Sequence, residues 1–396
     1  MPIGIARLSK LAFDGADLKP LWRGLLDQFV TGEDEVAALM DLATLEQIFG
    51  NVAGGIAFQK AALKRRRLFH SPRGEADPAL RLLALAAPGD IGVNTPLEFL
   101  LEGSDVALDT LYVLPGLDPP AELPACDLAI VAVGESDASR PVLAAIARQT
   151  ARWPVPMLND PLRIAMLARD RLPALLAGVS GLYVPATVRV ERATLVRLGK
   201  DEIEAADVVP DGAFQLIVRP IDSHAGRGLQ RLADAEALAA YLAERPERGF
   251  FVAPFIDYRS ADGLFRKYRI VFIGGKPYAC HMAIADQWMI YYLNAGMREN
   301  AAKRAEEERF MQRFDDDFAH RHEAALDAIA ARIGLDYFAI DCAELDDGRL
   351  LLFEADIAMI VHAMDPPEIF PYKGPQMRKV FDAFRALLRD RAGRVS

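Results

Sequence analysis

Three carboxylates near the C-terminal end of the chain, Asp341, Glu354 and Asp356, could bind a metal ion. Two short apolar runs flank the segment 346–348, and an Asp-Gly step between such runs is typical of a β-hairpin. Residues two apart project from the same face of a strand, so Glu354 and Asp356 share a face and Asp341 is expected opposite them. Hard oxygen donors of this kind suit Mg²⁺. The alternative is a hairpin whose acids are merely solvated at a strand end.

The bulk composition indicates a globular protein of several domains. With 396 residues the chain is too long for one ordinary core, so two to four domains or subdomains are expected. Hydrophobic residues make up 52% of the chain, which is enough to bury sizeable cores. No apolar run reaches the roughly 18 residues of a membrane span, and the N-terminus lacks a secretory segment. We therefore expect a soluble, cytoplasmic protein.

The net charge limits the expected binding partners, and the cysteines indicate the redox environment. A net charge of −10, with a pI near 5.3, disfavours binding to nucleic acid or to a membrane surface. The basic cluster at 64–67 is interpreted as a solvated helix end. The cysteines stand apart in apolar contexts, which predicts a reducing compartment and no zinc site. They are Cys126, Cys280 and Cys342.

The first 75 residues are expected to form a helical segment. Apolar residues recur at three- and four-residue spacing from about 17 to 67, with a break at Gly50 and Asn51. The helices on either side of that break resemble one unit of a helical-hairpin repeat, but a single copy is too little for a solenoid. A segment rich in proline, glycine and acids at 71–78 marks the boundary to the next domain.

Residues 76–157 are expected to form an open, mostly parallel α/β layer, because short apolar runs alternate there with amphipathic stretches. The pattern predicts strands at 80–87, 106–114 and 126–134 and helices at 94–103 and 139–153. The loops after the first and third strands are of the ligand-binding type. The sequence contains no GxGxxG and no GxxxxGK[ST], so neither a Rossmann dinucleotide site nor a Walker-type site is supported.

After residue 157 the pattern changes to α+β. A helix start at 159–161 opens one long amphipathic helix. The apolar strand that follows carries Arg219, and an arginine inside a strand needs an anionic partner. Small residues at 223–228 let backbone N–H groups approach phosphate oxygens, although a hairpin turn has the same composition. The remaining predicted elements are a strand at 249–258, a hairpin turning at 274–275 and a helix at 373–392.

The order of these segments resembles the ATP-grasp superfamily of carboxylate-amine ligases, the fold of glutathione synthetase and D-alanine:D-alanine ligase. The matching pieces cover roughly residues 155–396 and are, in order, LNDP, ARDRL, LIVRP, SHAGRGL, FVAPFI, RKYRIVFIGG, DCAEL and LLLFEAD. The resemblance implies two α+β subdomains, at 158–252 and 253–396, that sandwich ATP. The part at 76–157 resembles the Rossmann-like domain that precedes them in the family. The segment at 1–75 resembles the tetratricopeptide-like helices of one subgroup.

The resemblance implies a nucleotide site built from arginines, a loop and a strand end. Arg171 and Arg219 match two phosphate-binding positions that are usually lysine, and arginine keeps the charge while adding a planar fork. For Arg171 the alternative is a surface arginine on an amphipathic helix. Asp257 is expected at the ribose. The other implied residues belong to a flap over the phosphates or to the backbone that reads adenine: Ser223, His224, Ala225, Gly226, Gly228, Ala253, Phe255 and Ile256.

The same resemblance places the chemistry in the second subdomain. Arg269 matches the residue that faces the γ-phosphate and the acyl-phosphate intermediate, and Lys267 points to the same face. The alternative is cross-strand pairing of both with surface acids. The metal ligands are implied to be the three carboxylates named above, of which Asp356 replaces an asparagine. His362 lies where related ligases contact the acceptor substrate, and His224 and His281 are further candidates for orienting a nucleophile.

Together these residues predict a ligase that uses ATP with Mg²⁺ or Mn²⁺. A substrate carboxylate takes the γ-phosphoryl group to give an acyl phosphate, and an amine then displaces phosphate to form an amide. The expected partners are a small-molecule carboxylate and an amine, such as an amino acid or peptide, and a homodimer is expected by analogy. Two alternatives stay open: a nucleotide-binding regulatory or scaffold protein without turnover, and an ATP-grasp kinase that stops at a phosphorylated product.

Overall fold

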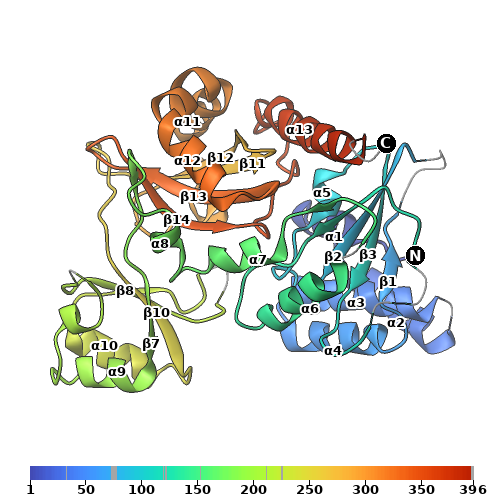
Figure 1. Ribbon diagram of the computed structural model, residues 1–396, viewed down its shortest axis with the longest axis horizontal. Helices are drawn as coiled ribbons and strands as arrows, with labels where there is room; N and C mark the ends of the chain where they lie inside the picture. The colour runs from blue at the N-terminus through green and yellow to red at the C-terminus, as the bar shows by residue number, and fades with distance from the viewer. Residues whose placement is uncertain are drawn as a thin grey trace.

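Three β-sheets organise the chain (Figure 1). The first and third sheets have five strands each and the second has four. The sheets are combined with helices throughout, and the N-terminal helices pack beside the first sheet. The predicted α/β and α+β class with a helical N-terminal segment is therefore confirmed. The computed structural model describes residues 1–393 apart from Glu33, 73–77, Pro119, 121–122, Arg152, Asp211 and 224–225.

The N-terminal segment is a group of four helices that bury leucines between them. They are α1 (Ile5–Phe13), α2 (Lys19–Thr31), α3 (Glu35–Ile48) and α4 (Val52–Leu63). The predicted break is confirmed: Gly50 has a φ of 88°, and the Asn51 side chain accepts the N–H of Gly54 at 3.0 Å and so caps α4. The sequence pattern missed α1, and it extended the last helix too far, because strand β1 (Leu68–His70) follows closely.

The first sheet has the strand order β1-β3-β2-β4-β5. Its parallel strands are β2 (Leu80–Ala86), β3 (Val106–Tyr112), β4 (Leu128–Val131) and β5 (Met157–Leu158), and β1 is antiparallel at the edge. Strand β4 is fully buried, as expected for a parallel sheet covered on both faces. The connecting helices are α5 (Leu97–Leu100) and α6 (Arg140–Thr150). Helix α5 is shorter than predicted because the Asn94 side chain pairs with the backbone of Ala87 and holds that segment extended.

The second sheet is antiparallel and has a core of its own. Its strands, in spatial order, are β7 (Val188–Glu191), β10 (Gly249–Pro254), β8 (Leu216–Pro220) and β9 (Gln230–Leu232). Helices α9 (Arg192–Leu198) and α10 (Ala235–Ala243) pack against it and bury Val218, Leu238 and Phe250 completely. Figure 1 shows this unit joined to the rest of the molecule by extended segments.

The third sheet contains both predicted hairpins. Its strands, in spatial order, are β12 (Lys276–Ala285), β11 (Phe265–Ile273), β13 (Tyr337–Glu344), β14 (Leu350–Asp356) and β6 (Leu182–Tyr183). The first hairpin turns at 274–275 and the second at 345–349, as the sequence predicted. Helices α11 (Ala301–Gln312), α12 (Glu323–Ile333) and α13 (Lys373–Gly393) accompany this sheet (Figure 1).

The segment after β5 is not the single long helix that its amphipathic pattern predicted. It forms α7 (Pro161–Ile164), a 3₁₀ turn (Ala165–Leu167) and α8 (Leu172–Leu175). Pro173 explains the break, because it has no N–H and its ring clashes with the carbonyl four residues earlier in a continuous helix. The residues between the two short helices, including Arg169 and Arg171, therefore lie in a turn and not on a helix face.

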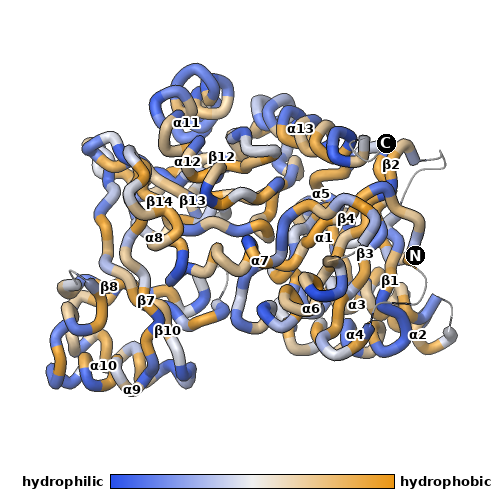
Figure 2. Tube along the Cα trace, viewed as in Figure 1, coloured by the Kyte–Doolittle hydropathy of each residue, from blue (hydrophilic) through white to orange (hydrophobic). Residues whose placement is uncertain are grey.

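The hydropathy of the residues differs between the sheets and the surface helices. In Figure 2 the hydrophobic residues concentrate in the sheets, whereas α11 is mostly hydrophilic and buries only Glu307 and Met311. In the part of the chain that the structure describes, no helix is long and apolar enough to cross a membrane. The three cysteines carry free thiols.

Candidate functional site

The hairpin of β13 and β14 brings the acidic residues together. The register places Asp341 directly opposite Glu354, and Asp356 opposite Ala339. Asp341 is only 1% exposed, whereas the side chain of Glu354 is 30% exposed. The carboxylates thus lie on paired strands as the Asp-Gly turn predicted, with Asp341 the most deeply buried.

Asp341 is held by two basic side chains from the neighbouring strand β11. Arg269 donates from Nε to Oδ1 at 2.8 Å and from Nη2 to Oδ2 at 3.0 Å, and Lys267 donates from Nζ to Oδ2 at 3.0 Å. Burial alone would raise the pKa of Asp341, but Arg269 and Lys267 outweigh it and hold that pKa far below its usual range. Both basic residues that the sequence assigned to the chemistry therefore meet the acidic group.

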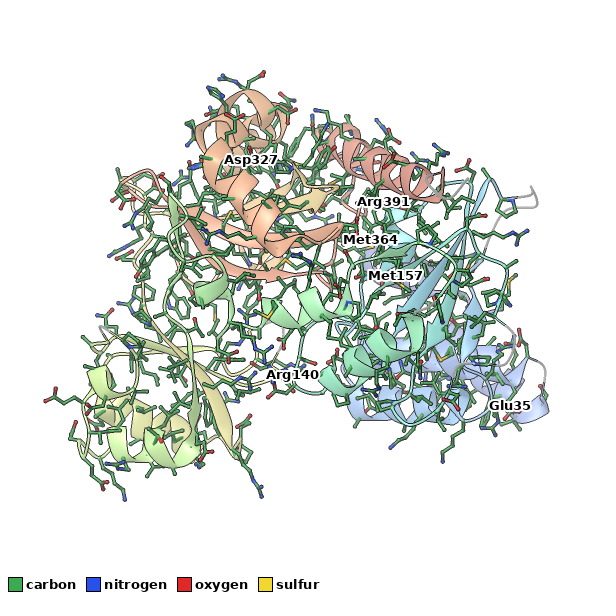
Figure 3. All side chains as sticks on the ribbon, viewed as in Figure 1. Glu35, Arg140, Met157, Asp327, Met364 and Arg391 are labelled. Atoms are coloured by element: carbon green, nitrogen blue, oxygen red, sulfur yellow. The ribbon has the colours of Figure 1, made fainter. Side chains whose placement is uncertain are left out.

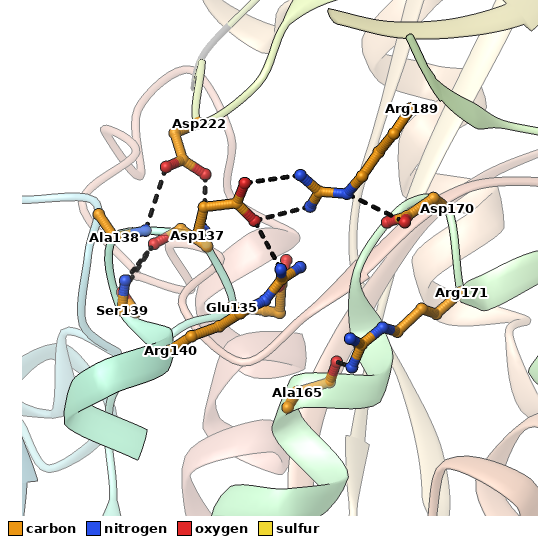
Figure 4. A network of polar contacts seen from close by, with 11 residues as sticks. Glu135, Asp137, Ala138, Ser139, Arg140, Ala165, Asp170, Arg171, Arg189 and Asp222 are labelled. Atoms are coloured by element: carbon orange, nitrogen blue, oxygen red, sulfur yellow. Dashed lines mark hydrogen bonds and ion pairs between the residues drawn. The ribbon is translucent and has the colours of Figure 1, made fainter. Parts of the chain in front are cut away.

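Arg169 reaches the same group from the turn before α8. Its guanidinium forms an ion pair with Glu354. Burial lowers the pKa of Arg169, although nearby carboxylates, Asp356 first among them, favour its charge. Arg171, the arginine that the resemblance matched to a phosphate contact, donates instead to the carbonyl of Ala165 at 3.1 Å (Figure 4). The structure thus brings Arg169, and not Arg171, to the carboxylates.

Arg219 is a buried cation near the end of β8. It is 9% exposed, and its Nε donates to the hydroxyl of Ser223 at 3.2 Å while Nη2 donates to the Ser223 carbonyl. Among the described residues no carboxylate pairs with it. Burial, and then the neighbouring charge of Arg169, lower the pKa of Arg219 to about 9. The guanidinium is still charged at neutral pH, and its surroundings favour an added anion.

The loop after β8 closes against Tyr291. Gly226 has a φ of 64°, and a Cβ built there would lie 1.2 Å from the Tyr291 hydroxyl oxygen. Only glycine fits this contact, because both the backbone conformation and the space exclude a side chain. Ser223 and Gly228 flank this part of the loop, and residues 224–225 lie outside the described residues.

The end of β10, where adenine is expected, presents backbone and an aromatic ring. The N–H of Phe255 donates to the carbonyl of Gln215 at 3.0 Å. The Phe255 ring lies edge-on to Trp288, with ring centroids 5.8 Å apart, and the Arg231 guanidinium lies 3.7 Å from the Phe255 ring centroid. The Phe255 N–H and ring thus already have partners in the free protein, and adenine recognition by this strand end stays a prediction.

The other residues at and just after the end of β10 have fewer contacts with the rest of the protein. Ala253 and Ile256 are partly exposed, as expected where backbone groups read a base. Asp257 is exposed and accepts from Nε of Arg259 at 3.0 Å, and the hydrogen bond from Arg259 holds the pKa of Asp257 below its usual range. A contact between Asp257 and ribose would require this pair to open, and it stays a prediction.

The loop after β4, which the sequence predicted to be of the ligand-binding type, contributes a carboxylate that the sequence did not single out. Gly134 approaches β14 so closely that a Cβ on it would lie 3.2 Å from Oδ1 of Asp356. The next residue, Glu135, has a side chain that is 11% exposed and accepts from Nη2 of Arg140 at 3.2 Å. Burial raises the pKa of Glu135 to about 7, with Asp356 adding to the effect and Arg140 opposing it. Figure 3 shows Arg140 at the end of α6 that faces the second sheet.

We expect Glu135→Gln to change the pH dependence of stability. Because the folded state raises this pKa above its unfolded value, the ionised carboxyl destabilises the fold, and stability falls as pH rises from about 4.5 to about 7. The variant should therefore be more stable than the parent by about 1–2 kcal/mol at pH 8 and by less than about 0.5 kcal/mol at pH 5. Urea unfolding of both proteins at the two pH values measures this. Glu236→Gln, at an exposed position, is the control, and a pH-independent difference for Glu135→Gln contradicts the prediction.

A second polar network joins the sheets around this site (Figure 4). Asp137, which follows β4, accepts from Nη1 and Nη2 of Arg189 on β7 at 2.6 and 2.7 Å, and Nε of Arg189 donates to Asp170 at 3.0 Å. The Asp222 carboxylate, directly after β8, accepts the N–H groups of Asp137 at 2.8 Å and of Ala138 at 3.1 Å. These contacts connect the second sheet to the segment that follows β4 of the first sheet, near Arg219 on β8.

The structure surrounds His362 with packing contacts. Its ring lies between Phe13 and Phe99, with ring centroids 6.2 and 6.1 Å away, and its Nδ1 accepts the N–H of Met364 at 3.1 Å. Burial lowers the pKa of His362 to about 4, so the imidazole is neutral at pH 7. His281 is partly exposed, but its Nδ1 is buried and has no partner among the described residues. A contact of either with an acceptor substrate stays a prediction.

The acidic group fits Mg²⁺ in its chemistry but not in its present arrangement. Asp341, Glu354 and Asp356 supply the hard oxygen donors that this ion prefers. No group of three His, Cys, Asp or Glu side chains within the described ranges is placed to hold a metal ion. In the free protein, Arg269 and Arg169 contact carboxylate oxygens of Asp341 and Glu354 that an ion would need. A magnesium site here requires those arginines to turn elsewhere.

Comparison with known proteins finds solved structures that are partly similar in shape at low sequence identity. No protein-family model matches the sequence, and no curated protein matches it either. Among solved structures, the D-alanine–D-alanine ligase from Bacillus anthracis complexed with ATP is 12% identical, covers 79% of this chain and 98% of its own, and has a TM-score of 0.48. The D-Ala:D-Ser ligase VanG from Enterococcus faecalis is 13% identical, with coverage of 78% and 99% and a TM-score of 0.48. A RimK domain ATP-grasp protein from Sphaerobacter thermophilus is 17% identical, with coverage of 79% and 99% and a TM-score of 0.45.

Proposed function

We propose that the protein is an ATP-dependent carboxylate–amine ligase of the ATP-grasp kind, forming an amide through an acyl phosphate. The observation that carries the proposal is Arg219, a buried guanidinium without a carboxylate partner among the described residues. A buried charge without a counter-ion is strongly unfavourable, so an anionic ligand accounts for its position. A triphosphate supplies that anion, and the guanidinium fork can bind it through two hydrogen bonds.

Three more cations border the same place. Arg169, Arg269 and Lys267 are paired in the free protein with Glu354 and Asp341. Phosphate oxygens accept the same N–H donors, so a bound triphosphate competes for these side chains. The exchange would free the carboxylates to hold Mg²⁺, which when bound neutralises phosphate charge. The order of the motifs along the sequence supports the same assignment of these side chains to the phosphates and the metal ion.

The proposed reaction has two steps. An oxygen of the substrate carboxylate attacks the γ-phosphorus, the bond to the β,γ-bridging oxygen breaks, and ADP leaves. The amine nitrogen of the second substrate then attacks the acyl carbon, loses a proton, and phosphate leaves with the electron pair of the C–O bond. Arg269 and Lys267 offset the negative charge on the transferred group. The loop at 223–228 covers the phosphates and excludes water, which would otherwise hydrolyse the acyl phosphate.

The test is incubation with ATP, Mg²⁺ and pooled amino acids, with nucleotide products and phosphate followed together. The proposal predicts ADP and phosphate in equal amounts, an increase on adding the correct substrate pair, and loss of turnover in EDTA that Mg²⁺ or Mn²⁺ restores. Release of AMP and pyrophosphate would reject the acyl-phosphate route.

The same experiment separates the two other classes of function. Tight ATP binding with no turnover across many acceptors would indicate a regulatory or scaffold protein. The ion pairs that occupy Asp341 and Glu354 in the free protein are the feature that favours this reading. A product whose mass has increased by one phosphoryl group, with no amide formed, would indicate a kinase.

A further inference from the structure

A cavity of about 140 Å³ lies between the N-terminal helices and the first sheet. Its walls come from α3 and α4, from β1, β2 and β3, and from the loop at 88–97. A cavity of similar volume in another protein holds one benzene molecule, so the space suits a ligand of about six to eight non-hydrogen atoms. The carboxylates and arginines of the candidate nucleotide site do not line it.

Three carboxylates line this cavity: Asp41 is buried, Glu98 is partly exposed, and Asp90, also partly exposed, forms an ion pair with Arg227. Asp41 on α3 is 3% exposed and accepts the N–H of Ile3 at 2.7 Å, and Glu98 on α5 accepts the N–H of Ala6 at 3.0 Å. Within the described residues no lysine or arginine lines the cavity. Burial, and then the neighbouring Glu98, raise the pKa of Asp41 to about 6 against the hydrogen bonds from the N–H groups of Ile3 and Gly4. A cation in the cavity would favour the ionised form of both Asp41 and Glu98.

Two glutamines line the same space with hydrogen-bond donors left over. Gln47 and Gln59 are 9% and 8% exposed, and their side-chain oxygens accept the N–H groups of Ile91 and Gly89, each at 2.8 Å. Neither side-chain nitrogen has a partner in the part of the chain that the structure describes. Both glutamines line the cavity, so an oxygen atom of a ligand there could accept from these amide nitrogens.

We propose that this cavity binds a small primary amine that also carries a hydroxyl group. The ammonium would lie against Asp41 and Glu98, and the hydroxyl oxygen would accept from Gln47 or Gln59. A ligand with its own carboxylate is disfavoured, because three acidic side chains already line the space. Neither the proposed ligase reaction nor its failure bears on this site, since the two sites have separate linings.

The test compares three compounds of similar size and different charge. Binding of 4-amino-1-butanol, 1,4-butanediol and 4-hydroxybutyrate to the full chain is measured by isothermal titration calorimetry at about pH 8, where the amine is charged. The amine alone is expected to bind. Glu98→Gln should weaken it roughly tenfold or more, whereas Glu102→Gln, at an exposed position just after α5, should leave it unchanged. Equal binding of the diol, or no binding of the amine to folded protein, overturns the proposal.

A second variant protects the test against misfolding. If Glu98→Gln does not fold, as judged by circular dichroism, Gln59→Leu replaces it, because that change keeps all three carboxylates and removes one amide donor. It should weaken 4-amino-1-butanol roughly fivefold and leave butylamine, which has no hydroxyl group, unchanged. Undiminished binding of the amino alcohol to Gln59→Leu contradicts the assignment of its hydroxyl group and overturns the proposal.

Discussion

Replacing Arg219 with methionine is expected to weaken ATP binding by roughly 100-fold, corresponding to about 3 kcal/mol, while leaving the free protein at least as stable as the parent. Affinity falls because two charge-assisted hydrogen bonds to phosphate are lost. Stability of the free protein is expected to rise by about 1–3 kcal/mol, because the variant no longer buries a guanidinium whose charged form burial and Arg169 disfavour. Calorimetric ATP titration and urea unfolding measure the two effects separately.

Arg171→Met is the matched control. It removes the same charge from the turn near the acidic group, but Arg171 donates only to the carbonyl of Ala165. ATP affinity should change by less than roughly threefold. Should Arg171→Met weaken ATP binding as much as Arg219→Met, the sequence-based assignment of Arg171 would be correct and the structural one incomplete. If Arg219→Met destabilises the free protein and leaves ATP affinity unchanged, Arg219 has a structural role and the proposed nucleotide site is wrong.

Replacing Asp341 with alanine is expected to lower the free energy of unfolding by about 3–5 kcal/mol at pH 7. The change leaves Arg269 and Lys267, whose side chains are each 17% exposed, without the carboxylate that neutralises them. Because folding depresses the pKa of Asp341, its contribution is fully present above the unfolded pKa near 4 and is lost as pH falls below it. The difference in the free energy of unfolding between the parent and Asp341→Ala should therefore become smaller at acidic pH. ATP turnover should be lost at every pH.

Two comparisons show whether the effect comes from unpaired buried charge. Asp346→Ala, in the exposed turn of the same hairpin, should change stability by less than about 0.5 kcal/mol. Adding Arg269→Met to Asp341→Ala should recover part of the loss, since it removes one of the stranded cations. A loss below about 1 kcal/mol for Asp341→Ala, or no recovery in the double variant, would show that the pair contributes little to the fold.

The elements of the site that depend on local patterns could be read from the sequence. The Asp-Gly turn and the two-residue spacing predicted that Asp341 would face Glu354, because strand pairing turns such spacing directly into geometry. For Arg219 the sequence predicted an anionic partner, because the arginine lies within an apolar strand; the residue is buried, but no carboxylate pairs with it among the described residues, and the phosphate contact stays a prediction. Lys267 and Arg269 are two apart on one strand and meet the same carboxylate.

The elements that depend on tertiary packing could not be predicted. Arg169 and Arg171 look equivalent in an amphipathic pattern, and only the break before Pro173 decides which of them faces Glu354. Glu135 joins the site because Gly134 lets its loop approach Asp356, more than 200 residues later in the chain. A contact of that kind has no signal in spacing or composition.

Asp222 ties the strand that carries Arg219 to the start of α6 through the amides of Asp137 and Ala138. The second sheet therefore cannot move independently of the segment before α6. Such a movement would first have to break these two hydrogen bonds, together with the ion pair between Arg189 and Asp137. Under the proposed function, nucleotide exchange is expected to require breaking these contacts, in the microsecond-to-millisecond range of domain movements, so that ADP release rather than bond formation limits the catalytic cycle.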